Sequence, residues 1–125
     1  MTITLATLAD ATAQEVFDQV VTHLLTQNKK SQNSVNNCLY RNGEGLACAA
    51  GCLISEEEMV GVQATGSNGV GWIGLIRTMK LTENHKALIS KLQNIHDDSH
   101  PEDWEEDSKS VAEARNLQFN WVKPA

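Results

Sequence analysis

Three cysteines lie close together in the sequence, at Cys38, Cys48 and Cys52, with the spacing C-x9-C-x3-C. Structural zinc and iron–sulfur sites usually take their thiolates from two closely spaced pairs. This chain has three thiols and a single close pair, so a metal site would need a histidine from elsewhere. We interpret the cysteines as small buried residues among the neighbouring alanines and glycines, because free cysteine packs like a small hydrophobe. A metal site and a redox-active thiol are the alternatives.

The stretch IHDDSH, residues 95–100, places two imidazoles and two carboxylates within five positions. Such groups can bind a divalent cation. Pro101 favours extended backbone at His100, so we do not expect His96 and His100 to share one helical face. We interpret the stretch as a helix end whose side chains bond exposed backbone groups. A metal or thiol enzyme built on the cysteines, His96 and Asp97 is the least favoured hypothesis, and we assign no catalytic residue, metal ligand or cofactor.

Five glycines fall between residues 61 and 74, in the sequence GVQATGSNGVGWIG. No Gly-Lys-Ser/Thr follows, as a phosphate loop requires, and the glycine spacing does not match a dinucleotide fingerprint. We expect a flexible surface loop here. The alternative is a loop that orders around a partner or a small, nucleotide-like ligand. We assign Trp72 and Asn68 to binding, since tryptophan is enriched at binding hot spots.

Acidic residues outnumber basic ones, with a formal net charge of −6 and a pI of about 5.1. This balance argues against nucleic acid or an anionic membrane as a partner, because both attract basic surfaces. The acid is concentrated between residues 97 and 107. Most such clusters are solvated faces, and the alternatives are a surface that meets a basic partner or one that imitates nucleic-acid phosphate. The carboxylates that we assign to partner binding are Asp97, Asp98, Glu102, Asp103, Glu105, Glu106 and Asp107.

The length of 125 residues fits a single domain, residues 1–125. Apolar residues recur at helical spacing in residues 12–27 and 82–97, and more thinly in residues 102–116. Thr12 and Glu15 have the spacing of a capping box, and Thr82 can cap the second helix. A short helix begins at Ser55 and, with glycines following from Gly61, is not expected to run far. Residues 117–122 alternate apolar with polar, which indicates an extended tail docked on the body.

Residues 38–41 and 46–49 are predicted to form a β-hairpin around the Asn42-Gly43 turn. A four-residue loop would pair Arg41 with Leu46. Cys38 and Cys48 would then face opposite sides of the ribbon and could not form a disulfide. The predicted fold class is therefore α+β, a mainly helical single domain with one short β-hairpin packed between the helices at 12–27 and 82–97.

Features that direct a protein to a membrane or out of the cell are not evident in the sequence. No apolar run approaches the roughly 20 residues that span a bilayer. The first 15 residues, MTITLATLADATAQE, have no basic region and no long apolar run, so we do not expect a secretion signal. The odd cysteine count without such a signal favours reduced thiols in a cytoplasm.

The chain contains the stretches AQEVFD at 13–18, LYR at 39–41, GLACA at 45–49, GCLI at 51–54, and LQNIHD at 92–97 followed by Pro101 and Trp104. These stretches resemble motifs of a family of small uncharacterised proteins from bacteriophages and prophages. The likeness covers most of the chain and fits least well at residues 60–80. Ala47 stands where that family leads us to expect a basic residue, and Asn42 where it leads us to expect glycine.

The resemblance implies a small accessory protein that acts in the cytoplasm of a host bacterium. We expect a non-enzymatic protein that binds and modulates or inhibits a host protein, such as a defence or nucleic-acid-handling factor, through its acidic surface. Electrostatic complementarity to a basic surface would provide the attraction. The alternative is a protein that binds or sequesters a small ligand under the glycine-rich loop.

Overall fold

The computed structural model describes residues 2–124, and in this part of the chain it contains five α-helices, three short 3-10 helices and no β-sheet. The fold is nearly all-α, so the predicted α+β class is wrong. The α-helices are α1 (Ala13–Gln27), α2 (Glu56–Ala64), α3 (Trp72–Met79), α4 (Lys86–Asp98) and α5 (Trp104–Ala114). The 3-10 helices are η1 (Leu8–Asp10), η2 (Ala50–Leu53) and η3 (Pro101–Asp103).

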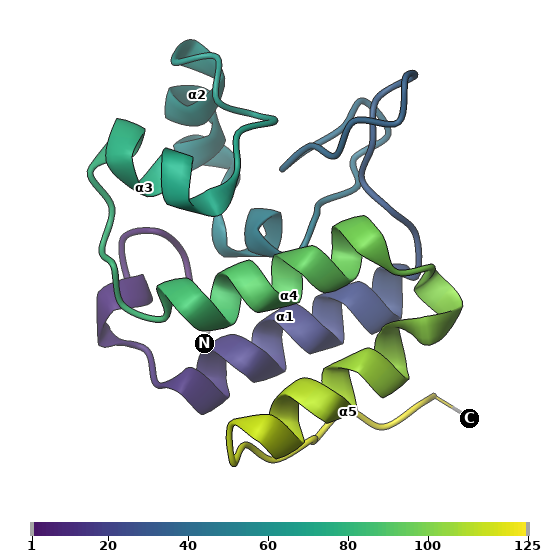
Figure 1. Ribbon diagram of the computed structural model, residues 1–125. Helices are drawn as coiled ribbons and strands as arrows, with labels where there is room; N and C mark the ends of the chain where they lie inside the picture. Colours follow the sequence, from purple (N-terminus) through teal and green to yellow (C-terminus); the bar gives the residue numbers. More distant parts are fainter. Residues whose placement is uncertain (1, 125) are drawn as a thin grey trace.

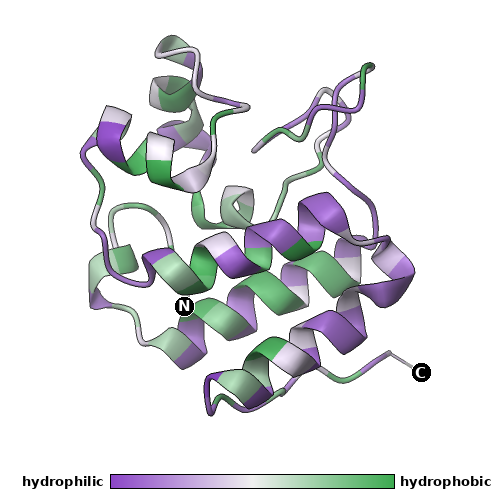
Figure 2. Cartoon of the chain, in the orientation of Figure 1, coloured by the Kyte–Doolittle hydropathy of each residue, from purple (hydrophilic) through white to green (hydrophobic). Residues whose placement is uncertain are grey.

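Helices α1 and α4 lie side by side and form the centre of the molecule (Figure 1). Helix α5 packs against both, whereas α2 and α3 form a second group on the other side of α4. A long segment, residues 28–49, connects α1 to η2 and rises beside the far end of α4. Figure 2 shows apolar residues gathered along α1 and α4 and a more polar α5. This arrangement places the cluster at residues 95–100 where α4, α5 and the long segment meet.

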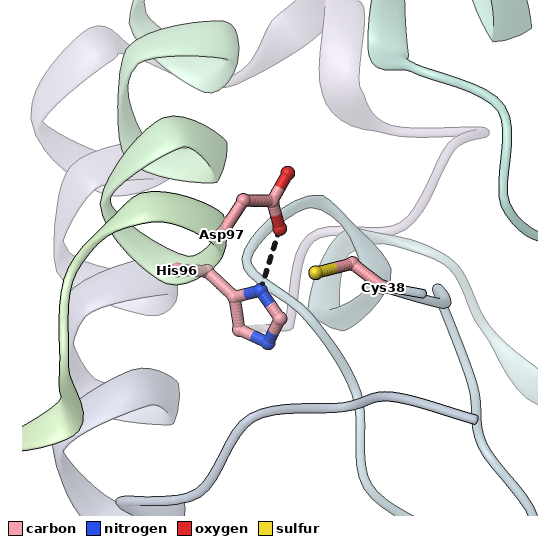
Figure 3. A group of neighbouring side chains, drawn as sticks. All are labelled: Cys38, His96 and Asp97. Carbon is pink, nitrogen blue, oxygen red and sulfur yellow. Dashed lines mark hydrogen bonds and ion pairs between the residues drawn. The ribbon is translucent and has the colours of Figure 1, made fainter. Parts of the chain in front are cut away.

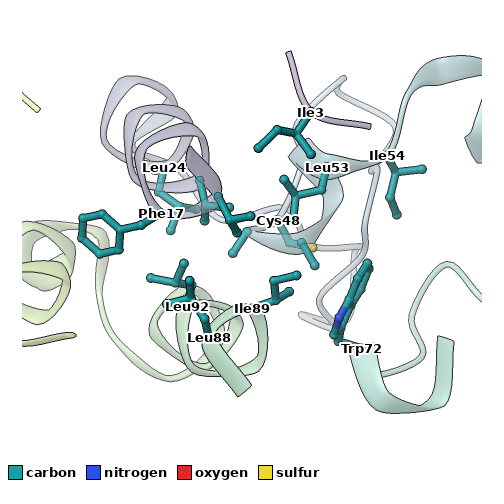
Figure 4. Packing of buried hydrophobic residues seen from close by; sticks show 14 of the residues in the cluster. Ile3, Phe17, Leu24, Cys48, Leu53, Ile54, Trp72, Leu88, Ile89 and Leu92 are labelled. Atoms are coloured by element: carbon teal, nitrogen blue, oxygen red, sulfur yellow. The ribbon is translucent and has the colours of Figure 1, made fainter. Parts of the chain in front are cut away.

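Helix α1 forms as its pattern predicts. Thr12 accepts a hydrogen bond from the Glu15 backbone N–H, and Glu15 accepts one from the Thr12 backbone N–H, which confirms the capping box. The helix ends at Asn28, whose φ of 53° places it in the left-handed region that asparagine tolerates. Its buried stripe faces α4 in Figure 4 and consists of Val16, Phe17, Val20, Val21 and Leu24.

Helix α4 begins at Lys86, four residues later than the predicted start at Thr82. The preceding residue, His85, has a φ of 62°, which interrupts helical geometry. Side chains near this point bond the N-terminal segment instead. The His85 Nε2 lies 2.7 Å from the Ala11 carbonyl oxygen, and Asn84 donates to the Ala9 carbonyl at 3.1 Å. Docking onto residues 9–11 therefore decides where α4 starts.

The glycine-rich region is more regular than its composition predicts. Helix α2 continues through Gly61 to Ala64, and α3 begins at Trp72 and contains Gly74. Only residues 65–71 lack helix, so the predicted irregular stretch is too long at both ends. Tertiary packing outweighs the helix penalty of glycine here. A Cβ at Gly61 would lie 3.3 Å from Met79 Cε, so this glycine allows α2 and α3 to approach closely.

The predicted β-hairpin does not form in the described chain. Arg41 makes an isolated bridge with Ala47, one residue away from the predicted partner Leu46. The backbone N–H groups of residues 39–41 find other acceptors: Leu39 donates to the Ser31 carbonyl at 2.9 Å, and Tyr40 to the Asn68 carbonyl at 2.9 Å. Backbone groups that bond residues 31 and 68 are not free to pair with residues 46–49. The prediction that Cys38 and Cys48 do not form a disulfide is confirmed, because all three thiols are free.

The CLYRNGEGLACAAGCLI stretch packs where the long segment meets the core. Cys48 is 2% exposed and lies between α1, α4 and Trp72 in Figure 4. A Cβ at Gly51 would overlap the carbonyl oxygen of Tyr40, so these two parts of the backbone touch. The Arg41 guanidinium adds hydrogen bonds to the carbonyls of Gly51 and Ile54. The expectation that small residues mark a close approach is confirmed at Gly51.

The C-terminal segment is docked, as its alternating pattern predicts. The Phe119 ring packs edge-on to Phe17 with 6.4 Å between centroids. The Gln118 backbone N–H donates to the Gln14 side chain at 2.8 Å. Among the helices of residues 2–124, none has the length and apolar character that crossing a bilayer requires.

Replacing Gly51 with alanine tests the contact between the two backbone segments. We expect Gly51→Ala to lower the free energy of unfolding by about 3 kcal/mol, because the new methyl group must displace the Tyr40 backbone. Gly43→Ala is the matched control, since a Cβ there would meet nothing within 4 Å. Urea unfolding measures both. Equal stability of the two variants would contradict the contact.

Candidate functional site

The imidazole of His96 is completely buried, yet both of its ring nitrogens have hydrogen-bond partners. Nε2 accepts the backbone N–H of Ser31 at 2.9 Å, so it carries no proton. The neutral ring must then carry its proton on Nδ1, which donates to Asp97 Oδ1 at 2.8 Å. The ring also stacks on Trp104, with centroids 5.5 Å apart and planes 26° apart. His96 therefore joins the long segment, the end of α4 and the start of α5.

Within residues 2–124, nitrogen donors bond only one of the two carboxylate oxygens of Asp97. Oδ1 accepts from His96 and, at 2.7 Å, from Gln93 Nε2. Lys30 approaches the same residue but donates to its backbone carbonyl, at 3.1 Å. Burial opposes ionisation of Asp97, but hydrogen bonds from His96, Cys38 and Gln93 outweigh it and hold its pKa below the usual value. Asp97 is thus a half-buried, negatively charged group.

Cys38 completes a compact group with His96 and Asp97, whose nitrogen, sulfur and oxygen atoms lie within 4.8 Å of one another. In Figure 3 the sulfur faces the carboxylate, and the free carboxylate oxygen points away from the imidazole. Burial, helped by the hydrogen bond to Asp97, raises the pKa of the Cys38 thiol to about 11. The thiol is therefore protonated at neutral pH and is a poor nucleophile.

The Cys38–His96–Asp97 group has the donor types of a zinc site but the wrong hydrogen bonds around it. A histidine that binds a metal through one nitrogen usually donates its other N–H to a carboxylate or carbonyl. Here the Nε2 of His96 faces the Ser31 N–H, which is itself a donor. Binding a metal at Nδ1 would therefore remove the only ring proton or break the Ser31 bond. The geometry favours a hydrogen-bond network over a metal centre.

Ser31, His96 and Asp97 also stand in the order of a serine–histidine–aspartate triad, but the contact to serine differs. A triad needs the serine hydroxyl on the imidazole. In this chain the backbone N–H of Ser31 makes that contact. The Ser31 hydroxyl instead donates to the carbonyls of Leu39 at 2.7 Å and Leu46 at 3.1 Å. Neither Ser31 nor Cys38 is placed to pass a proton to His96 Nε2.

The other two cysteines belong to the core, in agreement with the packing interpretation. Burial raises the pKa of Cys48 to about 12 and raises that of Cys52 further. The Cys48 sulfur accepts the Gly51 N–H at 3.3 Å. The positive charge of Arg41 acts to lower the pKa of Cys52, but burial outweighs it, so neither thiol is activated.

A cavity of about 450 Å³ opens beside Asp97, between the long segment, α4 and the 68–71 loop. We call it the Asp97 cavity. Its apolar wall comes from Leu39, Tyr40 and Val70, and the thiols of Cys38 and Cys48 also reach it. Apart from Asp97, its polar side chains are neutral amides, namely Asn33, Asn36, Asn37, Asn68 and Gln93.

A larger and more open groove of about 850 Å³ runs between α4 and α5. Its floor is apolar, with Ile95, Val111 and Ala114. Because α4 and α5 run in opposite directions, one end of this α4–α5 groove is acidic, with Asp98 and Asp107. The opposite end carries the basic residues Lys91 and Arg115.

The structure divides the predicted binding residues among five environments. Asn68 and Asp97 line the Asp97 cavity, whereas Asp98 and Asp107 line the α4–α5 groove. Glu105 pairs with Lys109 at 3.1 Å. Trp72 is 3% exposed and packs against Tyr40, so it is a core residue in place of the expected surface hot spot. Three acids are exposed around the start of α5, namely Glu102, Asp103 and Glu106.

Sequence reasoning missed Gln93, which shapes the cavity, and assigned Asn68 to binding without predicting its backbone contacts. Gln93 bonds the Ala50 N–H at 2.9 Å as well as Asp97, and so joins η2 to α4. Asn68 bonds both the N–H and the carbonyl of Arg41, at 3.1 and 2.8 Å, in the manner of a β-strand. No local pattern predicts the bonds of Gln93 to Ala50 and of Asn68 to Arg41, because these partners lie 43 and 27 positions away in the chain.

No family model, curated protein or solved structure matches this chain. The resemblance to phage and prophage proteins therefore stays a prediction. Its function has to be inferred from the chemistry of the groove, the cavity and the residues around them.

Acid titration tests the Asp97 network. A carboxylate whose pKa is lowered by folding contributes stability above its ordinary pKa, and that contribution disappears as the pH falls through the lowered value. We expect Asp97→Asn to lower the free energy of unfolding at pH 7 by roughly 1–2 kcal/mol and to reduce its loss at acidic pH. Asp98→Asn, at an exposed neighbouring carboxylate, is the control. If the free energy of unfolding depended on pH identically in both variants, the Asp97 network would not be the source of the acid sensitivity.

Alkylation tests the surroundings of Cys38. At pH 7 we expect the folded protein to react with iodoacetamide far more slowly than the urea-unfolded chain, because burial and Asp97 keep this thiol protonated. Asp97→Asn should accelerate labelling of Cys38 without affecting Cys48, which mass spectrometry of the peptides can resolve. Fast labelling of Cys38 in the folded wild type would show that the thiol is activated.

Proposed function

We propose that this chain is a non-enzymatic accessory protein that binds a basic, amphipathic segment of another protein in the α4–α5 groove. The observation that carries the proposal is the groove itself, with its apolar floor and one strongly acidic end. Grooves of this type accept an amphipathic helix, whose apolar face covers the floor. The proposed setting is a host bacterial cytoplasm and the proposed partner is a host protein, as the resemblance to phage proteins implies.

Charge at the acidic end supports the choice of a basic partner. Four exposed carboxylates, which we call the acidic face, extend beyond the groove: Asp98, Glu102, Asp103 and Glu106. Among residues 2–124, no lysine or arginine lies within ion-pair distance of Asp98, Glu102 or Asp103. Glu106 lies 3.6 Å from the Lys109 ammonium. Unpaired acid of this kind speeds association with a basic surface and selects against acidic ones.

Some residues of the acidic cluster at 97–107 stabilise the chain itself, so fewer of them are available to bind a partner. Glu105 and Asp107 lie in the first turn of α5, where negative charge offsets the positive end of the helix dipole. Asp107 also accepts a hydrogen bond from Ser99 at 2.6 Å. Glu106 lies in the same turn but is exposed, so it remains part of the acidic face. The proposed contacts are therefore the acidic face and, at the end of the groove, Asp107, but not Asp97 or Glu105.

The two ends of the groove suggest how a partner helix would be oriented. A helix carries partial positive charge at its N-terminus and partial negative charge at its C-terminus. Its N-terminus would be favoured beside Asp98 and Asp107, and its C-terminus beside Lys91 and Arg115.

A pair of charge-reversal variants tests the proposed function. Glu102→Lys with Asp103→Lys reverses the acidic face, whereas Glu56→Lys with Glu57→Lys gives the same change of net charge on α2. Each protein would serve as bait in a bacterial lysate, followed by quantitative mass spectrometry. We expect partners captured by the wild type to fall at least about tenfold with the first variant and little with the second. Equal loss with both variants, or capture that high salt leaves unchanged, would contradict a charge-guided interface.

A further inference from the structure

We infer that the Asp97 cavity is a binding site for a primary alkylammonium group. The cavity has room for a small organic cation, at about 450 Å³. It contains one ionised carboxylate, and the other polar groups of its lining residues are uncharged amides, thiols and a tyrosine hydroxyl. This site lies on the side of α4 away from α5, so the inference does not rest on the groove or on the proposed function.

The charge of Asp97 is not neutralised by a neighbouring cation. Its ion-pair neighbour His96 is a neutral ring, because Nε2 accepts the Ser31 N–H. Lys30 bonds the backbone carbonyl of Asp97, and among residues 2–124 no lysine or arginine nitrogen lies within 4.0 Å of its carboxylate. A half-buried charge without a counter-ion attracts a cation more strongly than an exposed one does, because the surrounding dielectric is lower.

The free acceptors favour an ammonium over a guanidinium. A guanidinium binds best with two parallel hydrogen bonds to both oxygens of a carboxylate. Oδ1 of Asp97 already accepts from Gln93 and His96, so only Oδ2 is open to an N–H group. An ammonium acts as a point charge with three donors that can turn toward separate acceptors. The side-chain amides of Asn36 and Asn37 have no hydrogen-bond partner in the described chain and can supply such acceptors.

The apolar wall accounts for the alkyl part of the ligand. Leu39, Tyr40 and Val70 line the cavity together with the amides. Tyr40 is held by the hydrogen bond from its hydroxyl to the Val70 carbonyl, so this wall is fixed before any ligand enters. A short methylene chain can cover this wall while its ammonium head reaches Asp97. The same chemistry occurs in a free alkylamine and in a lysine side chain of another protein.

An NMR titration of the folded protein tests the site directly. The probes are butylammonium, butylguanidinium and butanol, each at the same ionic strength, and the reporters are the side-chain amides of Gln93 and Asn68. We expect butylammonium to shift both reporters saturably, butylguanidinium to bind more weakly and butanol to have little effect. No saturable shift with butylammonium, or a shift of equal size with butanol, would overturn the proposal.

Three substitutions assign the binding to the cavity. Asp97→Asn should weaken butylammonium binding at least about tenfold, because a charge-assisted hydrogen bond is lost. Lys30→Met should strengthen it by removing a nearby positive charge. Asp98→Asn, on the α5 side of α4, should leave it unchanged, and equal weakening by Asp98→Asn and Asp97→Asn would overturn the proposal.

Gly69→Leu keeps the test decisive if Asp97→Asn does not fold. A Cβ at Gly69 would lie 3.6 Å from the Cys38 carbonyl and from Leu39, so the backbone accepts a side chain that narrows the cavity. Gly69→Leu should abolish butylammonium binding and leave the His96 network intact. Full binding by this variant would overturn the proposal.

A second arm distinguishes the two sources of the ligand. A short peptide with one central lysine would be compared with the same peptide acetylated at that lysine. Stronger binding of the lysine peptide than of butylammonium, lost on acetylation, would support a protein side chain as the occupant. Binding of butylammonium alone would support a free amine.

Discussion

The buried imidazole of His96 is the interaction on which the arrangement of this end of the molecule depends. A buried polar ring is tolerated only when its nitrogens are bonded, and each nitrogen left without a partner costs about 1–3 kcal/mol. Ser31 supplies the donor and Asp97 the acceptor, while Trp104 covers the face of the ring. The long segment, the end of α4 and the start of α5 must therefore take up their positions together.

The same requirement explains how residues 28–49 hold a fixed course without a sheet. Side chains take the place of a neighbouring strand: Asn68 bonds the backbone of Arg41, Asn42 accepts the Leu46 N–H at 2.9 Å, and Gln27 bonds both backbone groups of Ala47. Each of these side-chain amides offers N–H donors and a carbonyl acceptor, as a peptide group does. The segment is consequently rigid enough to form one wall of the Asp97 cavity.

The end of α4 separates two carboxylates that are adjacent in the sequence. Successive residues on an α-helix point about 100° apart. Asp97 therefore enters the cavity beside the long segment, whereas Asp98 reaches the groove beside α5. The first is partly buried and bonded on one oxygen, and the second is exposed. One acidic dipeptide thus contributes to a small-ligand cavity and to a protein-binding groove, which can operate independently.

Local sequence signals determined α1 with its capping box, the approximate extent of α5, the docked C-terminal segment and the packing role of Cys48. The two helices depend on helical periodicity and on bonds between residues three or four apart, and the other two features follow from apolar–polar alternation and from small residue size, all of which the sequence records. The failure of the hairpin, the start of α4 at Lys86 and the burial of Trp72 were decided by contacts with distant segments. The cavity and its chemistry belong to this second group, because Cys38, Asn68 and Asp97 come together only after folding. The sequence specifies which donors and acceptors are available, but the tertiary structure decides which of them are used up in pairing and which remain open to a ligand.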